Sequence, residues 1–148
     1  MSFADTVAQW AQQEGDRLEA IFQTSVQIAV NELRRPIADG GRMPVQSGNL
    51  RRSLSVSKFE MPSIKPDQAD FTDDDIAGVI LALFLGDTAF VGFQAAYAAR
   101  AEFGFVGEDS LGRLYNQTGH GFVSAVSQRW NQIVQEAEAV VNARSQQR

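Results

Sequence analysis

Apolar side chains recur every three to four residues along residues 3–34, and Gln, Glu and Arg fill the positions between them. The apolar positions of this stripe are Val7, Trp10, Leu18, Ile21, Phe22, Ile28 and Leu33. Residues at such spacings share one helix face, so the pattern predicts a long amphipathic helix. Pro36 ends it, because the residue before a proline disfavours the α region. Trp10 and Trp130 both lie on apolar stripes, and we expect both rings in the core.

The middle of the chain changes to patterns that favour strands. Between Leu50 and Phe59, Leu and Val alternate with Ser, which is the period of a half-buried strand. Ile76–Leu85 is apolar on both faces, and its length favours a central strand covered on both sides, although periodicity alone does not exclude a buried helix. Thr88–Phe93 is a short further strand. These segments predict an antiparallel sheet of three to four strands.

The last third of the chain is predicted to be helical apart from one connection. Residues 94–103 are rich in Ala and predict a short helix that ends at Gly104, and residues 104–121 are a glycine-rich connection. A C-terminal amphipathic helix then begins near Gly121, and the tail, residues 145–148, is expected to fray. The apolar stripe of this helix is Phe122, Val126, Trp130, Ile133, Ala137 and Val140. The order of elements indicates a single α+β domain over residues 1–148.

Composition narrows the classes of protein that fit. A chain of 148 residues is one ordinary domain and can bury a core. It contains no Cys, which excludes disulfides, iron–sulfur clusters, thiolate zinc sites and cysteine nucleophiles. The first fifteen residues lack a basic start followed by an apolar run, and the longest apolar stretch is too short to span a bilayer. The sequence therefore predicts a cytoplasmic product with no membrane contact.

The charge is concentrated in two neighbouring segments. The net charge of −5 argues against a broadly basic surface that holds nucleic acid through its phosphates. Residues 36–59 carry one acid against four bases, for +3, and residues 60–75 carry six acids against Lys65, for −5. The acidic segment also contains Pro62 and Pro66, which predicts a long loop or a hairpin tip.

Side chains with catalytic potential are few. The run Asp73-Asp74-Asp75 offers oxygen ligands for a metal ion, but consecutive side chains on an extended strand seldom converge, so a solvated or partner-facing charged run is the favoured interpretation. His120 is the only histidine, and no nucleophile motif surrounds it. We expect a structural hydrogen bond there. The sequence predicts no enzyme, no cofactor and no metal site.

The segment from Met43 to Ser53 is more informative. Pro44 fixes its own φ, Ser47 can bond the backbone ahead of it, and Gly48 permits a positive φ. The segment predicts a rigid turn that delivers a strand with an arginine pair, Arg51 and Arg52, at its base. A plain helix-to-strand connection is the alternative.

Two short motifs resemble a known family. Pro44-Val45-Gln46-Ser47-Gly48-Asn49-Leu50-Arg51-Arg52-Ser53 resembles the P-V-D-T-G-x-L-R-x-S motif of the neck and tail-completion proteins of long-tailed double-stranded-DNA bacteriophages, also called minor tail or head–tail joining proteins. Tyr97-Ala98-Ala99-Arg100-Ala101-Glu102-Phe103-Gly104 is similar to the family's Y-A-x-x-x-E-[FY]-G. A weaker match, Gly121–Ala125, resembles the start of the family's last helix. The matching positions are Pro44, Val45, Ser47, Gly48, Leu50, Arg51, Tyr97, Ala98, Glu102 and Gly104.

The resemblance implies a virion protein without enzymatic activity, assembled in the bacterial host's cytoplasm. It would form a ring, most often a hexamer, that completes the tail, contacts the tail-tube protein and the head-side connector, and leaves a channel for DNA. A head-to-tail ring needs two different complementary patches on each subunit, and the basic and acidic segments are two such patches in charge. The acidic loop would meet the basic segment of a neighbour or line the channel. The residues assigned to this contact are Arg51, Arg52, Asp70, Asp73, Asp74 and Asp75.

Two other classes of function remain open from the sequence. One is a metal-dependent nuclease that uses Asp73, Asp74, Asp75 and His120, which the lack of motif spacing disfavours. The other is a small DNA-binding or regulatory module, which the low isoelectric point and the absence of a concentrated basic helix disfavour.

Overall fold

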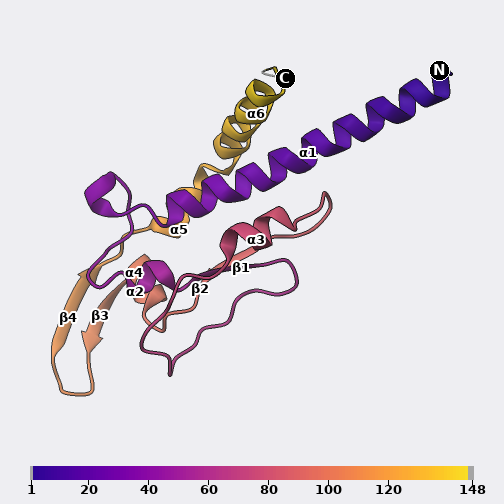
Figure 1. Cartoon of the computed structure of the whole chain (residues 1–148). Coiled ribbons are helices and arrows are strands. Elements are labelled where there is room, and N and C mark those ends of the chain that lie inside the picture. Colours follow the sequence, from indigo (N-terminus) through magenta and orange to yellow (C-terminus); the bar gives the residue numbers. More distant parts are fainter. Residues whose placement is uncertain (1, 147–148) are drawn as a thin grey trace.

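A computed structural model describes residues 2–146, and its elements extend outward from a central body in two directions (Figure 1). The N-terminal helix projects at one end, and a β-hairpin projects at the other. Within the described residues the chain holds six α-helices and two small antiparallel sheets of two strands each. The α+β class predicted from the sequence is therefore confirmed, whereas the single sheet of three to four strands is not observed.

Helix α1 (Phe3–Leu33) confirms the first predicted helix almost to the residue. It begins with a capping box, in which the Ser2 hydroxyl accepts from the Asp5 backbone N–H and the Asp5 carboxylate accepts from the Ser2 backbone N–H. Its C-terminal half is buried in the body through Val26, Val30 and other side chains, but every residue from Ser2 to Gln13 is exposed. We call the exposed segment Phe3–Gln13 the arm. The expectation that Trp10 is a core residue is wrong, since the ring is 65% exposed on the arm.

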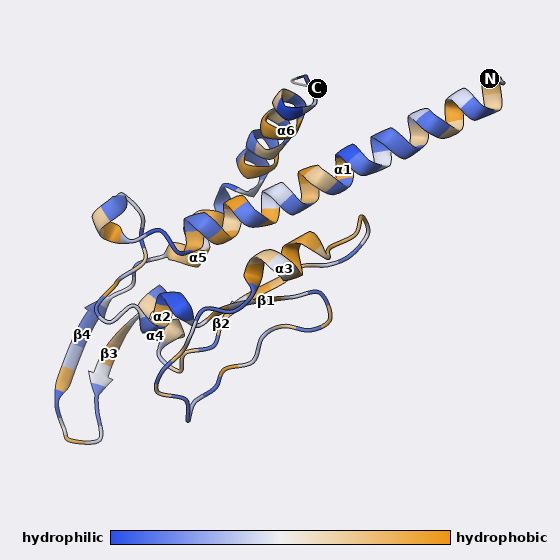
Figure 2. Cartoon of the chain, in the orientation of Figure 1, coloured by the Kyte–Doolittle hydropathy of each residue, from blue (hydrophilic) through white to orange (hydrophobic). Residues whose placement is uncertain are grey.

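The middle of the chain differs most from the sequence-based expectation. The predicted strand 50–59 begins instead with a short helix, α2 (Asn49–Arg52), before strand β1 (Leu54–Ser57). The apolar run 76–85 is helix α3 (Ile76–Leu81) followed by a turn, not a central strand. Asp75 caps this helix by accepting from the Gly78 backbone N–H, and the helix is hydrophobic along most of its length (Figure 2). Strand β2 (Phe90–Phe93) then pairs antiparallel with β1, Leu54 opposite Phe93.

The predicted helix 94–103 is shorter than expected, since helix α4 covers Ala98–Phe103. The glycine-rich connection after it contains a β-hairpin that the sequence pattern did not predict. Strand β3 (Gly104–Glu108) pairs with β4 (Leu114–Thr118), Gly104 opposite Thr118 and Glu108 opposite Leu114. We call β3, β4 and the turn between them the hairpin. The core clusters contain no residue of the hairpin, and one face of the hairpin exposes apolar side chains.

The last predicted helix is two helices, α5 (Phe122–Gln128) and α6 (Trp130–Gln146), which change direction at Arg129. The expectation that Trp130 is buried is wrong, because the break rotates its ring to the surface and leaves Val126 and Ile133 to face the body. Helix α6 packs along α1 and closes a small second cluster around Ile21. Ser145 and Gln146 belong to α6, and residues 147–148 of the tail that is expected to fray lie outside the described residues.

One main core joins these elements. It lies beneath the C-terminal half of α1 and takes side chains from α1, α2, β1, α3, β2, α4, α5 and α6. Phe93 of β2 and Phe122 of α5 meet edge to face at a centroid distance of 5.2 Å, which ties the first sheet to the last helices. The two segments that carry the sequence motifs lie on the rim of this core.

Candidate interface around the two sequence motifs

The first motif forms a turn followed by one turn of helix. Gly48 has a φ of +80°, which an L side chain rarely adopts, and its carbonyl accepts from the Arg52 backbone N–H. The Ser47 hydroxyl accepts from the Asn49 backbone N–H at 3.3 Å. Leu50 is buried in the main core. The turn predicted here is confirmed, but it leads into α2 rather than into a strand.

The second motif forms α4 and the start of the hairpin. Ala98 is buried, and Gly104 has a φ of +88° at a point where a Cβ would lie 2.5 Å from the Gln117 carbonyl oxygen. Glu102 is buried although it carries an ionisable group, and its two carboxylate oxygens accept from the Val123 and Ser124 backbone N–H groups, both at 2.9 Å. These are the second and third residues of α5, so Glu102 caps a helix that is distant in sequence.

The structure brings the two motifs together. The Asn49 side-chain amide lies 3.5 Å from the Tyr97 hydroxyl, and a pocket of about 600 Å³ opens between the two segments. His120 lines the same pocket, and its backbone N–H donates to the Ala101 carbonyl at 2.9 Å. The residues around the pocket are Pro44, Gln46, Ser47, Gly48, Asn49, Leu50, Tyr97, Arg100, Ala101, Gln117, Thr118 and His120.

Several residues of this site were not singled out from the sequence. Asn49 occupies the variable position of the first motif, yet it is buried and holds the acidic segment: its amide donates to the Ala69 carbonyl at 2.9 Å, and its Oδ1 accepts from the Phe71 N–H at 2.7 Å. Arg100 stacks on the Phe105 ring of the hairpin at 4.0 Å. The sequence shows only that Asn49 follows a turn glycine, and its burial depends on how the acidic segment packs against α2. The approach of Arg100 to Phe105 depends on the unpredicted hairpin.

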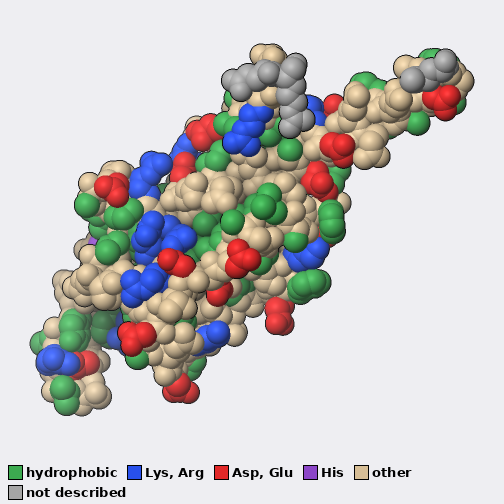
Figure 3. Space-filling model, in the orientation of Figure 1, with side chains coloured by type: hydrophobic (Ala, Val, Ile, Leu, Met, Phe, Trp, Pro, Cys, Tyr) green, Lys and Arg blue, Asp and Glu red, His purple; other side chains and the backbone are tan. Residues whose placement is uncertain are grey.

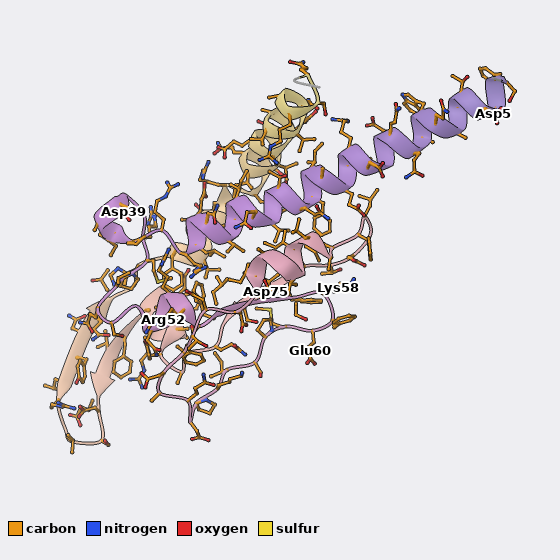
Figure 4. The ribbon with its side chains drawn as sticks, viewed as in Figure 1. Asp5, Asp39, Arg52, Lys58, Glu60 and Asp75 are labelled. Atoms are coloured by element: carbon orange, nitrogen blue, oxygen red, sulfur yellow. The ribbon has the colours of Figure 1, made fainter. Side chains whose placement is uncertain are left out.

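The arginine pair is half-buried and bonded within the chain. Arg51 donates from Nε to the Arg34 carbonyl at 2.8 Å, next to the last residue of α1. Arg52 donates from Nε to the Phe71 carbonyl at 2.8 Å and from Nη1 to the Ser47 carbonyl at 3.1 Å (Figure 4 shows Arg52 on α2). The pair therefore fixes the turn, α1 and the acidic segment to one another.

The three consecutive aspartates have different surroundings. Asp73 pairs with Arg34 at 2.7 Å, Asp75 caps α3, and Asp74 lies exposed between them. Among residues 2–146 no group of three or more His, Cys, Asp or Glu side chains is placed to hold a metal ion. Asp70 is exposed as well, and so are Glu60 and Asp67. The prediction that Arg51, Arg52 and these aspartates form a contact between subunits stays a prediction.

The turn of the hairpin is organised by Asp109. Its carboxylate accepts from the Leu111 and Arg113 backbone N–H groups at 2.9 Å, from the Arg113 guanidinium and from the Tyr115 hydroxyl. Partial desolvation raises the pKa of Asp109, but these hydrogen bonds to the ionised form outweigh it, and the pKa lies below its ordinary value. Desolvation and the neighbouring Asp109 charge raise the pKa of Tyr115.

Exposed apolar side chains gather on both projecting elements (Figure 3). The arm exposes Phe3, Val7 and Trp10. The hairpin exposes Val106 and Leu114, on one face of its ribbon, together with Leu111 in the turn and Phe103 just before β3. Between them, the end of α3 and the following turn expose Leu81, Phe84 and Leu85. Free-standing soluble proteins seldom expose several such sets, which mark surfaces that contact other molecules.

No protein-family model, no curated protein and no solved structure matches the chain. None of the helices in residues 2–146 is long and apolar enough to cross a membrane.

Proposed function

We propose that the protein is a structural subunit of a bacteriophage neck, which assembles into a ring of about six copies where the tail joins the head. In this role it has no catalytic activity and no cofactor. It contacts the tail-tube protein on one side and the head-side connector on the other, and genomic DNA passes through its channel. The protein is built in the cytoplasm of a bacterial host and ends in the virion.

The observation that carries the proposal is the exposure of apolar side chains at both ends of the chain. Phe3 and Trp10 project from the arm, and Val106 and Leu114 project from the hairpin, while the main core lies between them. A subunit that contacts a neighbour on each side needs two different surfaces, since only unlike surfaces repeat around a ring. An enzyme or a monomeric regulator has no such need.

The two motifs support the same proposal in a second way. The segments that resemble the phage family meet around Asn49 and Tyr97, and three more of their side chains have structural roles: Glu102 caps α5, and Arg51 and Arg52 bond main-chain carbonyls. Motif positions that serve packing and capping suit a protein whose task is to hold a shape. They offer no nucleophile paired with a base.

The mass of the native assembly tests the proposal. We expect native mass spectrometry of the purified protein to give a mass near six times 16.2 kDa, and averaged electron micrographs to show a ring with a central channel. A stable monomer overturns the proposal. Cleavage of DNA in the presence of Mg²⁺ or Mn²⁺, or a shift of linear duplex DNA on a gel at low salt, overturns it in favour of the nuclease or the regulatory module.

The acidic segment gives a second test within the same proposal. Asp67 and Asp70 are exposed and form no ion pair with another described residue, unlike Asp73, which pairs with Arg34. An acidic channel wall repels DNA and lets it slide, whereas an acidic contact between subunits strengthens the ring. We expect Asp67→Lys with Asp70→Lys to leave the fold unchanged and to alter either the salt dependence of ring assembly or the retention of duplex DNA. If neither changes, the acidic segment has no part in the ring.

A further inference from the structure

The pocket between the two motifs is lined by hydrogen-bond donors and by no acid. Its lining includes Tyr97, Arg100 and His120, whose side chains can all donate, and no Asp or Glu of the described chain belongs to it. The volume of about 600 Å³ is in the range of ligand-binding pockets. A donor-rich pocket with one permanent cation and no carboxylate of its own suits an anionic group with acceptor oxygens.

Arg100 is the cation of this pocket, and its guanidinium is already held in place. Its Cζ lies 4.0 Å from the centroid of the Phe105 ring, so the stack occupies one face of the guanidinium. The N–H groups lie in the plane of the guanidinium and stay available, because Arg100 makes no ion pair and no side-chain hydrogen bond with another described residue. A fixed guanidinium with free N–H groups can bind a carboxylate through two parallel hydrogen bonds.

Asp70 is a carboxylate that the chain also holds in a fixed position. The residues on either side of it are bonded to Asn49, through the Ala69 carbonyl at 2.9 Å and the Phe71 N–H at 2.7 Å. The Asp70 carbonyl accepts from the Gln68 side chain at 2.9 Å. The Asp70 side chain is nevertheless exposed and forms no ion pair with another described residue. It also does not line the pocket of its own chain.

Most other charged side chains that the sequence assigned to a subunit contact are engaged within the chain. Arg51 and Arg52 donate to main-chain carbonyls. Asp73 is in an ion pair, and Asp75 caps α3. Asp70 has no such contact, so its carboxylate is available to a guanidinium that also lacks a partner.

We infer that Asp70 of one copy binds Arg100 in the pocket of a second copy. Because Asp70 does not line the pocket of its own chain, the two contact surfaces are different. The contact is therefore head to tail and repeats from copy to copy, as a ring requires. The inference deepens the proposed ring by naming one of its contacts, and it rests on that proposal in requiring that copies associate.

Reversal of the two charges tests the pair. We expect Arg100→Glu and Asp70→Arg each to raise the dissociation constant of the assembly about tenfold or more, measured by analytical ultracentrifugation over a dilution series. Chains that carry both substitutions should largely recover the wild-type dissociation constant. A change at Asp70 cannot repair a fold damaged at Arg100, so recovery separates a contact from structural damage. A double variant that assembles no better than the single variants overturns the inference.

Two matched controls and one conservative variant sharpen this test. The controls are Arg42→Glu and Asp39→Arg, since both side chains are exposed and lie outside the pocket. Both should assemble like the wild type, with unchanged circular dichroism. Arg100→Lys keeps the charge but lacks the planar guanidinium, so we expect an intermediate dissociation constant. An Arg100→Lys variant that assembles like the wild type contradicts a contact through two parallel hydrogen bonds.

The absence of native cysteines makes a direct test possible. Gln46 lines the pocket and is exposed. When Asp70→Cys and Gln46→Cys chains are mixed and treated with a short thiol-specific cross-linker, we expect a covalent dimer of one chain of each kind. The pair Asp39→Cys with Gln46→Cys is the control and should remain monomeric on a denaturing gel. Absence of the dimer in the Asp70–Gln46 mixture overturns the inference.

The outcomes separate this inference from the proposed function. A wild-type ring that Arg100→Glu weakens and the double variant restores supports both. A wild-type ring that is unaffected by Arg100→Glu overturns the contact and leaves the ring standing. An open chain of copies that depends on both residues supports the contact and overturns the ring. A wild-type monomer overturns both. Duplex DNA that binds the wild type but not Arg100→Glu identifies a phosphate as the ligand and overturns the contact.

Discussion

Replacing Glu102 is the sharpest test of how the second motif works. In Glu102→Ala, the Val123 and Ser124 backbone N–H groups lose the carboxylate that accepts from both at 2.9 Å. Loss of a helix cap costs about 1–2 kcal/mol, and a hydrogen bond to a charged group is worth about 1.5–3 kcal/mol. Because both N–H groups lie near the surface, water can bond to them in the variant and offset part of this loss in free energy. We therefore expect a loss of about 2–4 kcal/mol in the free energy of unfolding.

Glu102→Gln separates the charge from the shape. The amide keeps one acceptor oxygen but turns an N–H₂ group toward the second backbone N–H, so one of the two hydrogen bonds is lost. We expect a loss of about 1–2 kcal/mol, between the wild type and the Ala variant.

Urea unfolding followed by circular dichroism at one protein concentration measures both changes. For a domain of this size, each kcal/mol lowers Tm by about 2–4 °C, so Glu102→Ala should melt about 5–15 °C below the wild type. The control is Glu108→Ala, which removes an exposed carboxylate from the neighbouring strand β3 and should change stability by less than about 0.5 kcal/mol. A Glu102→Ala variant as stable as this control would refute the capping role.

Two further predictions concern the segments around the site. Asn49→Ala removes the hydrogen bonds to Ala69 and Phe71, so we expect a loss of about 2 kcal/mol in stability and faster proteolysis within residues 60–70, with cleavage elsewhere unchanged; equal proteolysis of the two proteins contradicts this. The lowered pKa of Asp109 means that its ionised form stabilises the hairpin above about pH 4, and this contribution is lost as the pH falls through the lowered value. The protection of the β3 and β4 amides, referred to their intrinsic exchange rates at each pH, should fall there in the wild type, and Asp109→Asn should show the lower protection already at neutral pH.

The long helix was predictable because its signals agree with one another. A continuous apolar stripe at helical spacing, followed by a proline, predicts a helix over residues 3–34. The helix in the structure spans Phe3–Leu33. The apolar stripe does not show which part of the helix is buried by the rest of the chain and which part stays exposed. Trp10 continues the same face that Ile21 buries. The hydrogen bond and ion pair that join α6 to α1 are made by Arg17, to Asn142 and Glu138, and the Trp10 side chain one and a half to two turns further along is left exposed.

The apolar run 76–85 has no polar residues to mark one face, so its pattern does not distinguish a helix from a strand. The buried residues are Ile76, Ile80 and Leu83, spaced by four and three, as on a helix face. The exposed residues between them are also apolar, so both periodicities fitted the sequence. Asp75 is the deciding signal, because an Asp before an apolar run is a typical helix cap, but an acidic triplet also suits a charged run or a set of metal ligands.

The hairpin was missed for a related reason. Val106 and Leu114 face water instead of the core, so no buried alternation marked the strands, and glycines suggested a loop. The candidate site could be predicted only in part. The motif segments were identified one by one, but their meeting at Asn49 and Tyr97, and the approach of His120 to both, depend on how α2, α4 and the hairpin pack.

The capping box at Ser2 and Asp5 has a consequence for the arm. Isolated helices of this length are marginal in water, and Gly15 lowers the helix propensity further where the arm leaves the body. The box satisfies N–H groups of the first turn, where fraying would begin, and α1 continues without a break into the packed body. The arm is therefore helical before it meets anything. A partner that bound the arm would have to order side chains rather than backbone, which would keep the loss of conformational entropy small.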